Sequence, residues 1–359
     1  MKQATQQADE EPGHTQGMGK RLDAALTARG FTTWRLRVRA AAVLSVFVVG
    51  VSWFLLYRLT NVGGPDSVCD GAATAGQVHD VLGSGRISEH KSEKHSTMAA
   101  SSGYSCSATV SSGLFETAKK TVWFTIALDT KGPHDLAAPD ARLFSGGSVG
   151  SVTSQKAWAL LPEGCDKGLR AEVETVEEGR DETRARLAVA FANRAAKANR
   201  CADQKLPMPK SLSAKGAEAA PNWAELCGLP GFAPAKDPEA QWPYQQQVTT
   251  ASDPIWSCTI TRRSLGTLPQ TFAITTEPRT TALDQKEGAR PSEFGRAHQI
   301  GKETPAELVV TCHGRDVFFS VDGGYEPTLD KHYLFPDQMD LMRQFLTAGG
   351  KAIGCEPIL

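Results

Sequence analysis

The chain has 359 residues, 40% of them hydrophobic and 22% charged, which is enough for two or three domains with buried cores. Proteins that bind nucleic acid through bulk charge are usually basic. The formal net charge of −1 and the pI of about 6.7 therefore argue against nucleic acid as a partner.

Residues 1–39 are predicted to be a basic cytoplasmic tail. They contain seven Lys or Arg and four Asp or Glu, so seven minus four gives +3 and the rest of the chain carries −4. Residues 1–17 are polar and predicted to be disordered. Residues 19–31 fit a short basic amphipathic helix at the inner leaflet.

Residues 40–57 are predicted to be a transmembrane helix, because they contain no charge and would span roughly 27 Å, close to the thickness of a hydrocarbon core. Three arginines precede this run and one follows it, at Arg35, Arg37, Arg39 and Arg58. The positive-inside rule then places the N-terminus in the cytoplasm. A cleaved signal peptide is the alternative, but the leader is long and residues 61–67 lack a small-residue cleavage motif, which favours an uncleaved signal anchor.

All the cysteines follow this apolar run, which fits an oxidising compartment outside the cytoplasm. They are Cys69, Cys106, Cys165, Cys201, Cys227, Cys258, Cys312 and Cys355. Their spacing is too wide for a zinc ribbon or a thioredoxin-like redox site, so structural disulfides are predicted.

After a juxtamembrane linker over 58–66, two blocks are predicted to be tandem copies, 67–204 and 222–359, joined by a linker over 205–221. Successive cysteine gaps are 37, 59 and 36 residues in copy one and 31, 54 and 43 in copy two. The words around the second cysteine also match, since Tyr104-Ser-Cys parallels Trp256-Ser-Cys.

In copy one, Thr74 is expected to cap a helix over 75–82 that ends at Gly83. The alternating pattern of 121–130 predicts a strand, and 157–165 and 169–176 predict a hairpin. A helix over 181–201 closes the copy, with Asp181 as its expected N-cap.

Copy two repeats this order without the first helix. Strands are expected over 271–278, 306–312 and 317–324, followed by a helix over 336–355 capped by Asp337. Phe335, Met339, Met342 and Leu346 fall on one face of that helix. The fold class is therefore predicted to be α+β, with each copy an antiparallel sheet and a C-terminal helix packed on it.

Eight cysteines allow 105 pairings, and only three remain if the bridges stay inside each copy and both copies pair alike. Order in the chain favours Cys69–Cys106, Cys165–Cys201, Cys227–Cys258 and Cys312–Cys355. Pairing first with fourth and second with third is the main alternative. Each bridge would contribute roughly 3 to 4 kcal/mol in the chain-entropy model.

The C-terminal helix, the cysteine-containing hairpin and the aromatic-Ser-Cys strand resemble the small disulfide-bonded extracytoplasmic domains of actinobacterial lipoproteins and the sensor domains of mycobacterial membrane Ser/Thr kinases. The resemblance covers 67–204 and 222–359. It implies an α+β fold with sequential disulfides, and it implies no catalytic residues. This chain departs from the pattern in having two copies and no cytoplasmic kinase domain.

Two motifs have catalytic or metal-binding interpretations. Gly146-Gly-Ser148-Val-Gly150 matches a nucleophile elbow, but no full strand precedes it and no helix pattern follows, so a surface loop is predicted. Metal binding by Glu89, His90, Glu93 and His95 is weighed against a solvated loop, which is favoured because the histidines are not at helical spacing.

Other candidates are weaker or more general. His298, His313 and His332 stand alone, and the acidic run Glu174–Glu182 lacks the residues of a calcium loop. The aromatic residues of copy two carry the best site hypothesis, a binding groove formed by Trp223, Trp242, Tyr244, Trp256 and Tyr325.

We therefore predict no catalytic residue, cofactor or metal. The expected function is a single-pass cell-membrane protein whose extracytoplasmic region binds or senses an envelope ligand or a partner protein. A cell-envelope hydrolase with an unrecognised active site is the alternative.

Overall fold

The computed structural model describes residues 24–25, 27–28, 34–91, 103–113, 118–128, 140–144, 146–165, 169–176, 180–214, 216–238, 243–252, 255–262, 269–277, 279, 290–300, 307–323 and 334–359. Five residues singled out from the sequence lie outside the described residues, as does most of the tail: Glu93, His95, Trp242, Tyr325 and His332.

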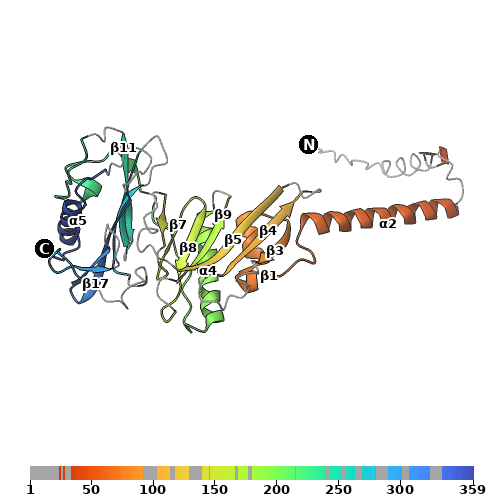
Figure 1. Cartoon of the computed structure of the whole chain (residues 1–359). Coiled ribbons are helices and arrows are strands. Elements are labelled where there is room, and N and C mark those ends of the chain that lie inside the picture. The colour runs from red at the N-terminus through yellow and green to blue at the C-terminus, as the bar shows by residue number, and fades with distance from the viewer. Residues whose placement is uncertain are drawn as a thin grey trace, which may run out of the picture.

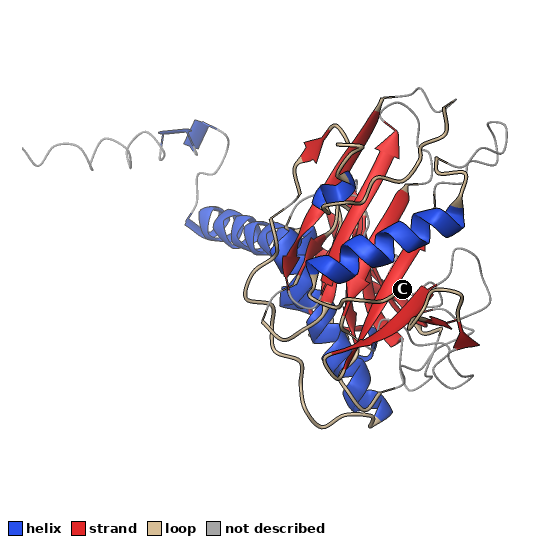
Figure 2. Ribbon diagram, turned by 90° about the vertical axis from the view of Figure 1, so that its left-hand side faces the viewer, coloured by secondary structure: helices blue, strands red, loops and turns tan. Residues whose placement is uncertain are grey.

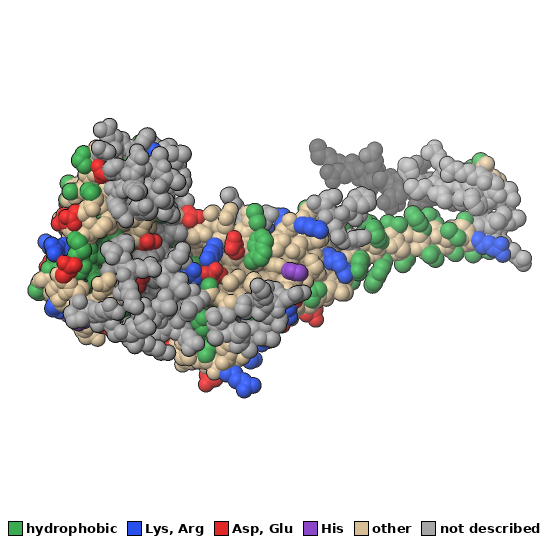
Figure 3. Space-filling model, in the orientation of Figure 1, with side chains coloured by type: hydrophobic (Ala, Val, Ile, Leu, Met, Phe, Trp, Pro, Cys, Tyr) green, Lys and Arg blue, Asp and Glu red, His purple; other side chains and the backbone are tan. Residues whose placement is uncertain are grey.

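Helix α2 (Trp34–Leu59) projects from the rest of the molecule as an apolar rod (Figures 1 and 3). Its segment Val38–Tyr57 is long and apolar enough to cross a membrane, and 0% of its most apolar window is buried. The predicted apolar helix is therefore present, and α2 extends beyond the uncharged run 40–57 at both ends.

Copy one forms a seven-stranded antiparallel sheet in the order β3-β4-β5-β9-β8-β7-β6. A two-stranded ribbon, β1 (Ser67–Val68) and β2 (Ala73–Thr74), precedes it and flanks the turn η1 (Cys69–Gly71). The sheet strands are β3 (Arg86–Lys91), β4 (Ser105–Ser112), β5 (Ala118–Leu128), β6 (Arg142–Leu143), β7 (Gly150–Val152), β8 (Lys156–Leu160) and β9 (Leu169–Thr175).

Copy two forms an eight-stranded antiparallel sheet in the order β10-β11-β12-β13-β17-β16-β15-β14. Its strands are β10 (Glu218–Ala219), β11 (Tyr244–Ser252), β12 (Ile255–Arg262), β13 (Gln270–Thr275), β14 (Arg290–Pro291), β15 (His298–Ile300), β16 (Glu307–Cys312) and β17 (Arg315–Asp322). Apart from the short β10, the strands follow one another in the same spatial order as in copy one, which confirms the expected common strand order.

The four disulfides are Cys69–Cys106, Cys165–Cys201, Cys227–Cys258 and Cys312–Cys355. These are the pairs that the order of the cysteines favours, and no bridge joins the two copies. Each copy therefore has one bridge from its N-terminal turn to a sheet strand, β4 in copy one and β12 in copy two, and another that holds the end of its last helix.

The short helix α3 (Ala75–Leu82) is built as its sequence predicts. Thr74 and Gln77 form a reciprocal capping box, Gly83 ends the helix at a φ of 92°, and Val78, Val81 and Leu82 are buried. Among the described residues of copy two, the corresponding segment holds only the turn η4 (Leu226–Gly228).

A long helix packs on one face of each sheet, α4 (Asp181–Asn199) in copy one and α5 (Gln338–Ala352) in copy two (Figure 2). Asp337 caps α5, as predicted, by accepting a 2.8 Å hydrogen bond from the Asp340 amide. Phe335 lies before the helix rather than on it, although it is buried in the same core, and Met339 is only partly buried. Leu341 and Phe345 complete the buried face.

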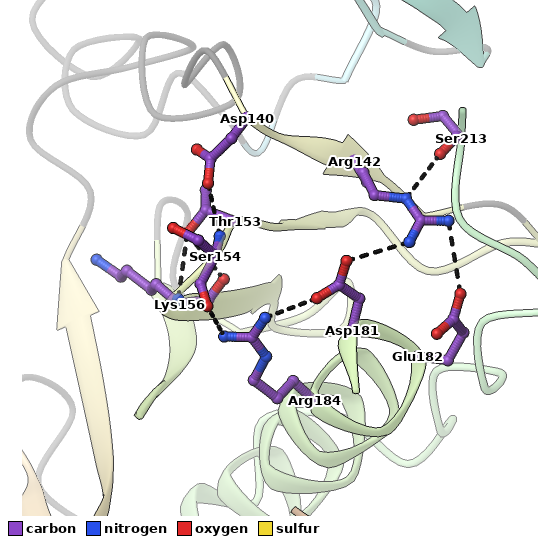
Figure 4. Close-up of polar contacts among 9 residues, drawn as sticks. All are labelled: Asp140, Arg142, Thr153, Ser154, Lys156, Asp181, Glu182, Arg184 and Ser213. Carbon is purple, nitrogen blue, oxygen red and sulfur yellow. Dashed lines mark hydrogen bonds and ion pairs between the residues drawn. The ribbon is translucent and has the colours of Figure 1, made fainter. Parts of the chain in front are cut away.

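The prediction that Asp181 caps α4 is wrong. The N-cap is Arg180, in a left-handed conformation and without a capping hydrogen bond from its side chain, and Asp181 is the first helical residue. Its carboxylate instead pairs with Arg142 of β6 at 3.1 Å and with Arg184 at 2.7 Å (Figure 4). The two guanidinium groups compete for the carboxylate that the local pattern assigns to the backbone.

The segment predicted as a linker, 205–221, makes contacts with both copies. The Leu206 amide donates a hydrogen bond to Asn193 Oδ1 of α4 at 2.7 Å, and the Ser213 hydroxyl accepts one from the Leu143 amide at 2.8 Å. Further on, Gln247 of β11 donates to the Gly216 carbonyl at 2.8 Å, and β10 pairs with β11. This segment is therefore held along its length rather than acting as a free tether.

Candidate functional site

An amphipathic groove of about 530 Å³ lies at the end of the copy-two sheet where α5 terminates. Its apolar lining is Ile255, Trp256, Ile274, Val317 and Ile353, and its polar lining is Thr275, Thr276, His313 and Arg315, with Cys312 beside them. The volume is in the range typical of small-molecule sites. None of these lining residues is an Asp or a Glu.

The walls of the groove are set by close packing between α5 and the sheet. The Trp256 ring stacks on Phe345 with centroids 6.2 Å apart and an interplanar angle of 29°. Glycine at 349 lets the helix lie against β13, because a Cβ there would be 2.8 Å from Ile274 Cδ1. One turn later the helix ends, and Ile353, which is 40% exposed, borders the groove.

The polar rim comes from the β16–β17 hairpin, whose two-residue turn is His313-Gly314. Both turn residues have positive φ, 50° and 76°. This conformation suits a tight hairpin. His313 Nε2 lies 2.8 Å from the Gly354 carbonyl oxygen. Because a carbonyl only accepts, this nitrogen carries the hydrogen, and Nδ1 is left to face other partners.

Arg315 follows the turn and is exposed. Within the described part of the chain, its guanidinium has no ion-pair or hydrogen-bond partner. The neighbouring Asp316 is engaged with Thr311 at 2.9 Å. The groove therefore combines an apolar wall with one uncompensated positive charge.

The corresponding region of copy one is closed. According to the strand registers, Tyr104, Ile126 and Leu169 of copy one are equivalent to Trp256, Ile274 and Val317 of copy two. The three copy-one residues all belong to one buried core. The connection between β8 and β9 is longer here, spanning 161–168, and Leu161 from it is buried in the same core. The short His313-Gly314 turn of copy two provides no such cover.

Copy one has a different cleft, of about 420 Å³, lined by Ser67, Asp70, Gly71, Glu89, Lys91 and Arg194. Lys91 bridges Asp70 at 2.5 Å and Glu89 at 3.2 Å, and Arg194 Nε donates to the Asp70 carbonyl at 2.9 Å. The hydrogen bond to Asp70 raises the pKa of Lys91. These charges satisfy one another, so we interpret the cleft as structural.

Two catalytic or metal-binding candidates from the sequence have structural settings of their own. Ser148 lies between β6 and β7, is 3% exposed, and is followed by a strand rather than by the helix of a nucleophile elbow. Glu89 and His90 lie on β3 rather than in a loop, and Glu89 accepts a 3.0 Å hydrogen bond from the Cys69 amide. Within the described residues, no group of three potential metal ligands occurs.

Of the aromatic residues in the predicted binding groove, one lines the groove described above. Trp256 lines the groove, whereas Trp223 and Tyr244 pack together with ring centroids 6.0 Å apart, away from it, with Lys236 over the Trp223 ring at 5.1 Å. His298 is the exposed first residue of β15. In the acidic run, Asp181 and Glu182 pair with Arg142. Arg315 lines the groove but was not among the residues singled out from the sequence, where the turn His-Gly between two strands was the available signal.

Comparisons with protein-family models, with curated proteins and with solved structures found no match to this chain.

Proposed function

We propose that this protein is a non-catalytic binding or sensing protein of the cell envelope. Helix α2 serves as its single membrane span, the N-terminal tail lies in the cytoplasm, and both copies lie outside. The apolar exposed surface of Val38–Tyr57 supports the span. Four disulfides support an oxidising compartment for the two copies. The proposal also rests on the resemblance of the two copies to the extracytoplasmic domains of actinobacterial lipoproteins.

The groove of copy two carries the binding role. Duplication supplies two similar scaffolds, and only copy two has the short turn that leaves this end of the sheet uncovered. Copy one, whose equivalent core is closed, acts as the rigid unit next to the membrane anchor. A site opened in one copy of a duplicated fold is a natural place for a ligand.

The topology is tested with reporter fusions at residue 30 and at the C-terminus. A periplasm-type reporter should be active only at the C-terminus. External protease should remove the two copies from intact spheroplasts. Protection of the C-terminal region would overturn the proposed orientation.

The binding role is tested by filling the groove. Full-length protein in lipid nanodiscs is exposed to solvent extracts of envelope small molecules, washed, and analysed by native mass spectrometry. The wild type should retain a compound that Ile353→Trp does not. Val176→Trp is the matched control, since Val176 is 68% exposed on copy one. Retention that does not differ between wild type and Ile353→Trp would contradict the role.

A further inference from the structure

We infer that the groove of copy two selects an amphipathic small molecule that has an apolar body and a single anionic group. This inference rests on the proposed binding role and adds the chemical class of the ligand.

The apolar half of the site follows from its walls. Trp256 contributes an indole, and Ile274, Val317 and Ile353 have side chains of aliphatic carbon only. A polar body such as a free sugar would lose hydrogen bonds to water here and gain few in return. An alkyl chain or a hydrophobic ring would instead be removed from water on a surface that is already preformed.

The anionic half follows from the charge balance at the rim. Arg315 is exposed, its guanidinium has no partner in the described part of the chain, and the lining contains no carboxylate. The acids that flank the lining residues along the chain are engaged elsewhere, Asp316 with Thr311 at 2.9 Å and Glu277 with Arg279 at 2.7 Å. A planar guanidinium presents paired donors that match a carboxylate or a phosphate.

The threonine hydroxyls at the rim fit the same occupant. Thr276 lines the groove and is exposed, and its hydroxyl can donate to an acid. Thr275 accepts the Glu277 amide at 3.0 Å and still has its own hydroxyl hydrogen to donate. A small number of donors at one end of an apolar groove orients an amphipathic ligand with its acid outward.

The probes are labelled octanoate and labelled 1-octanol, which share an apolar body and differ in the acid. Full-length protein in nanodiscs is dialysed to equilibrium against empty nanodiscs. The empty nanodiscs take up probe by partition into lipid, so the excess of probe on the protein side measures binding to the protein. Wild type should bind octanoate at least about ten-fold more tightly than octanol. Octanoate and octyl phosphate compared side by side then distinguish a carboxylate from a phosphate as the preferred acid.

Variants then separate the outcomes. Arg315→Gln should weaken octanoate about ten-fold and leave octanol within two-fold, because it removes only the charge-assisted contact. Arg343→Gln is the matched control, since Arg343 is on α5 and pairs only loosely with Glu293 at 3.8 Å. Ile353→Trp should reduce both probes.

Equal binding of octanoate and octanol, or octanoate binding that Arg315→Gln leaves unchanged, would overturn the anionic ligand class while the result with the envelope extract still stands. A concentration-dependent dimer in mass photometry that is lost in Ile353→Trp would identify the groove as a contact between two copies of the chain. That outcome would overturn the ligand proposal.

Discussion

Phe191 of α4 meets Phe124 of β5 nearly edge-on, with ring centroids 5.4 Å apart and an interplanar angle of 82°. The same pair of positions is in contact in copy two, where Phe345 and Phe272 lie 5.3 Å apart at a tilt of 54°. In each copy a third ring completes the group, Tyr104 at 6.0 Å from Phe191 and Trp256 at 6.2 Å from Phe345. The contact between helix and sheet is thus built from the same three positions in both copies.

Phe191→Ala and Phe345→Ala should each lower the free energy of unfolding by about 3 to 5 kcal/mol, because both rings are fully buried and leave a cavity. The measurement is guanidinium denaturation followed by circular dichroism, fitted with a transition for each copy. Val176→Ala, at an exposed site, should change the free energy by less than about 0.5 kcal/mol. A loss below about 1 kcal/mol in either phenylalanine variant would contradict the shared aromatic core.

A second duplicated device involves the first cysteine of each copy. The Cys69 amide donates to Glu89 at 3.0 Å, and the Cys227 amide donates to Gln246, also at 3.0 Å. Cys69 and Cys227 both have a positive φ, 56° and 60°. The backbone bends there in a way that leaves the amide without a partner in regular structure, so a side chain from a neighbouring strand, β3 in copy one and β11 in copy two, satisfies it.

The features foreseen from the sequence are those set by local pattern and by order along the chain. Thr74 caps its helix because its partner, Gln77, is three residues away. The cysteine pairs follow chain order because each bridge joins elements that are neighbours in one copy. Asp181 was misassigned because Arg142, from β6, competes for its carboxylate and only the folded sheet brings that strand to the helix. Likewise, the groove is open because, in the described part of copy two, no connection like 161–168 of copy one lies over Trp256. No sequence motif marks the lack of such a covering segment.

The second prediction concerns the ion pair between Asp181 and the fully buried Arg184. Arg184 is 0% exposed and donates to Asp181 at 2.7 Å and to the Ser154 carbonyl at 2.5 Å (Figure 4). Asp181→Asn should therefore destabilise copy one by about 3 kcal/mol, since it leaves a buried guanidinium uncompensated. Arg184→Met should cost less, because an apolar side chain of similar length needs no partner.

The double variant distinguishes this explanation from simple loss of packing. Asp181→Asn combined with Arg184→Met should be no less stable than Asp181→Asn alone, because the buried charge is gone. Additive losses measured by denaturation would show that the carboxylate acts mainly through Arg142 instead.

Tyr104 makes the third prediction, on the dependence of stability on pH. Its ring is fully buried, and its hydroxyl has no hydrogen-bond partner among the described residues. Burial raises the pKa of Tyr104, and the nearby carboxylates of Asp70 and Glu89 raise it further. The folded protein therefore keeps the phenol neutral above pH 10, where the unfolded chain ionises it.

Because folding raises the pKa of Tyr104, its ionisation does not affect the free energy of unfolding below about pH 10. As the pH rises above this value, ionisation of the unfolded chain lowers the free energy of unfolding. Tyr104→Phe should be about 1 kcal/mol more stable than wild type at neutral pH, since it removes an unsatisfied buried hydroxyl. Its advantage should widen above pH 10. Lys91 titrates alike in both proteins and cancels in the difference between them. A gap between the two proteins that stays constant with pH would contradict the shift.

The last prediction concerns the junction between the membrane anchor and copy one. Tyr57 ends the apolar segment of α2, and the Arg86 guanidinium carbon of β3 lies 3.9 Å from the centre of its ring. Next to it, the Ile87 amide donates to Asn61 Oδ1 at 3.1 Å, and Asn61 Nδ2 donates to the Pro65 carbonyl at 3.0 Å. Strand β3 is the edge of its sheet, so this amide faces outward and has no neighbouring strand.

Asn61→Ala should therefore expose the Ile87 amide and speed its hydrogen exchange about ten-fold, while the exchange of central-strand amides such as that of Phe124 stays unchanged. Tyr57→Leu, which removes the cation–π contact but keeps the side chain apolar, should have a smaller effect of the same sign. Tyr57→Phe is the control and should match wild type. The measurement is exchange mass spectrometry on the full chain in nanodiscs. If Ile87 exchanges at the wild-type rate in Asn61→Ala, the anchor and copy one are not coupled through this hydrogen bond.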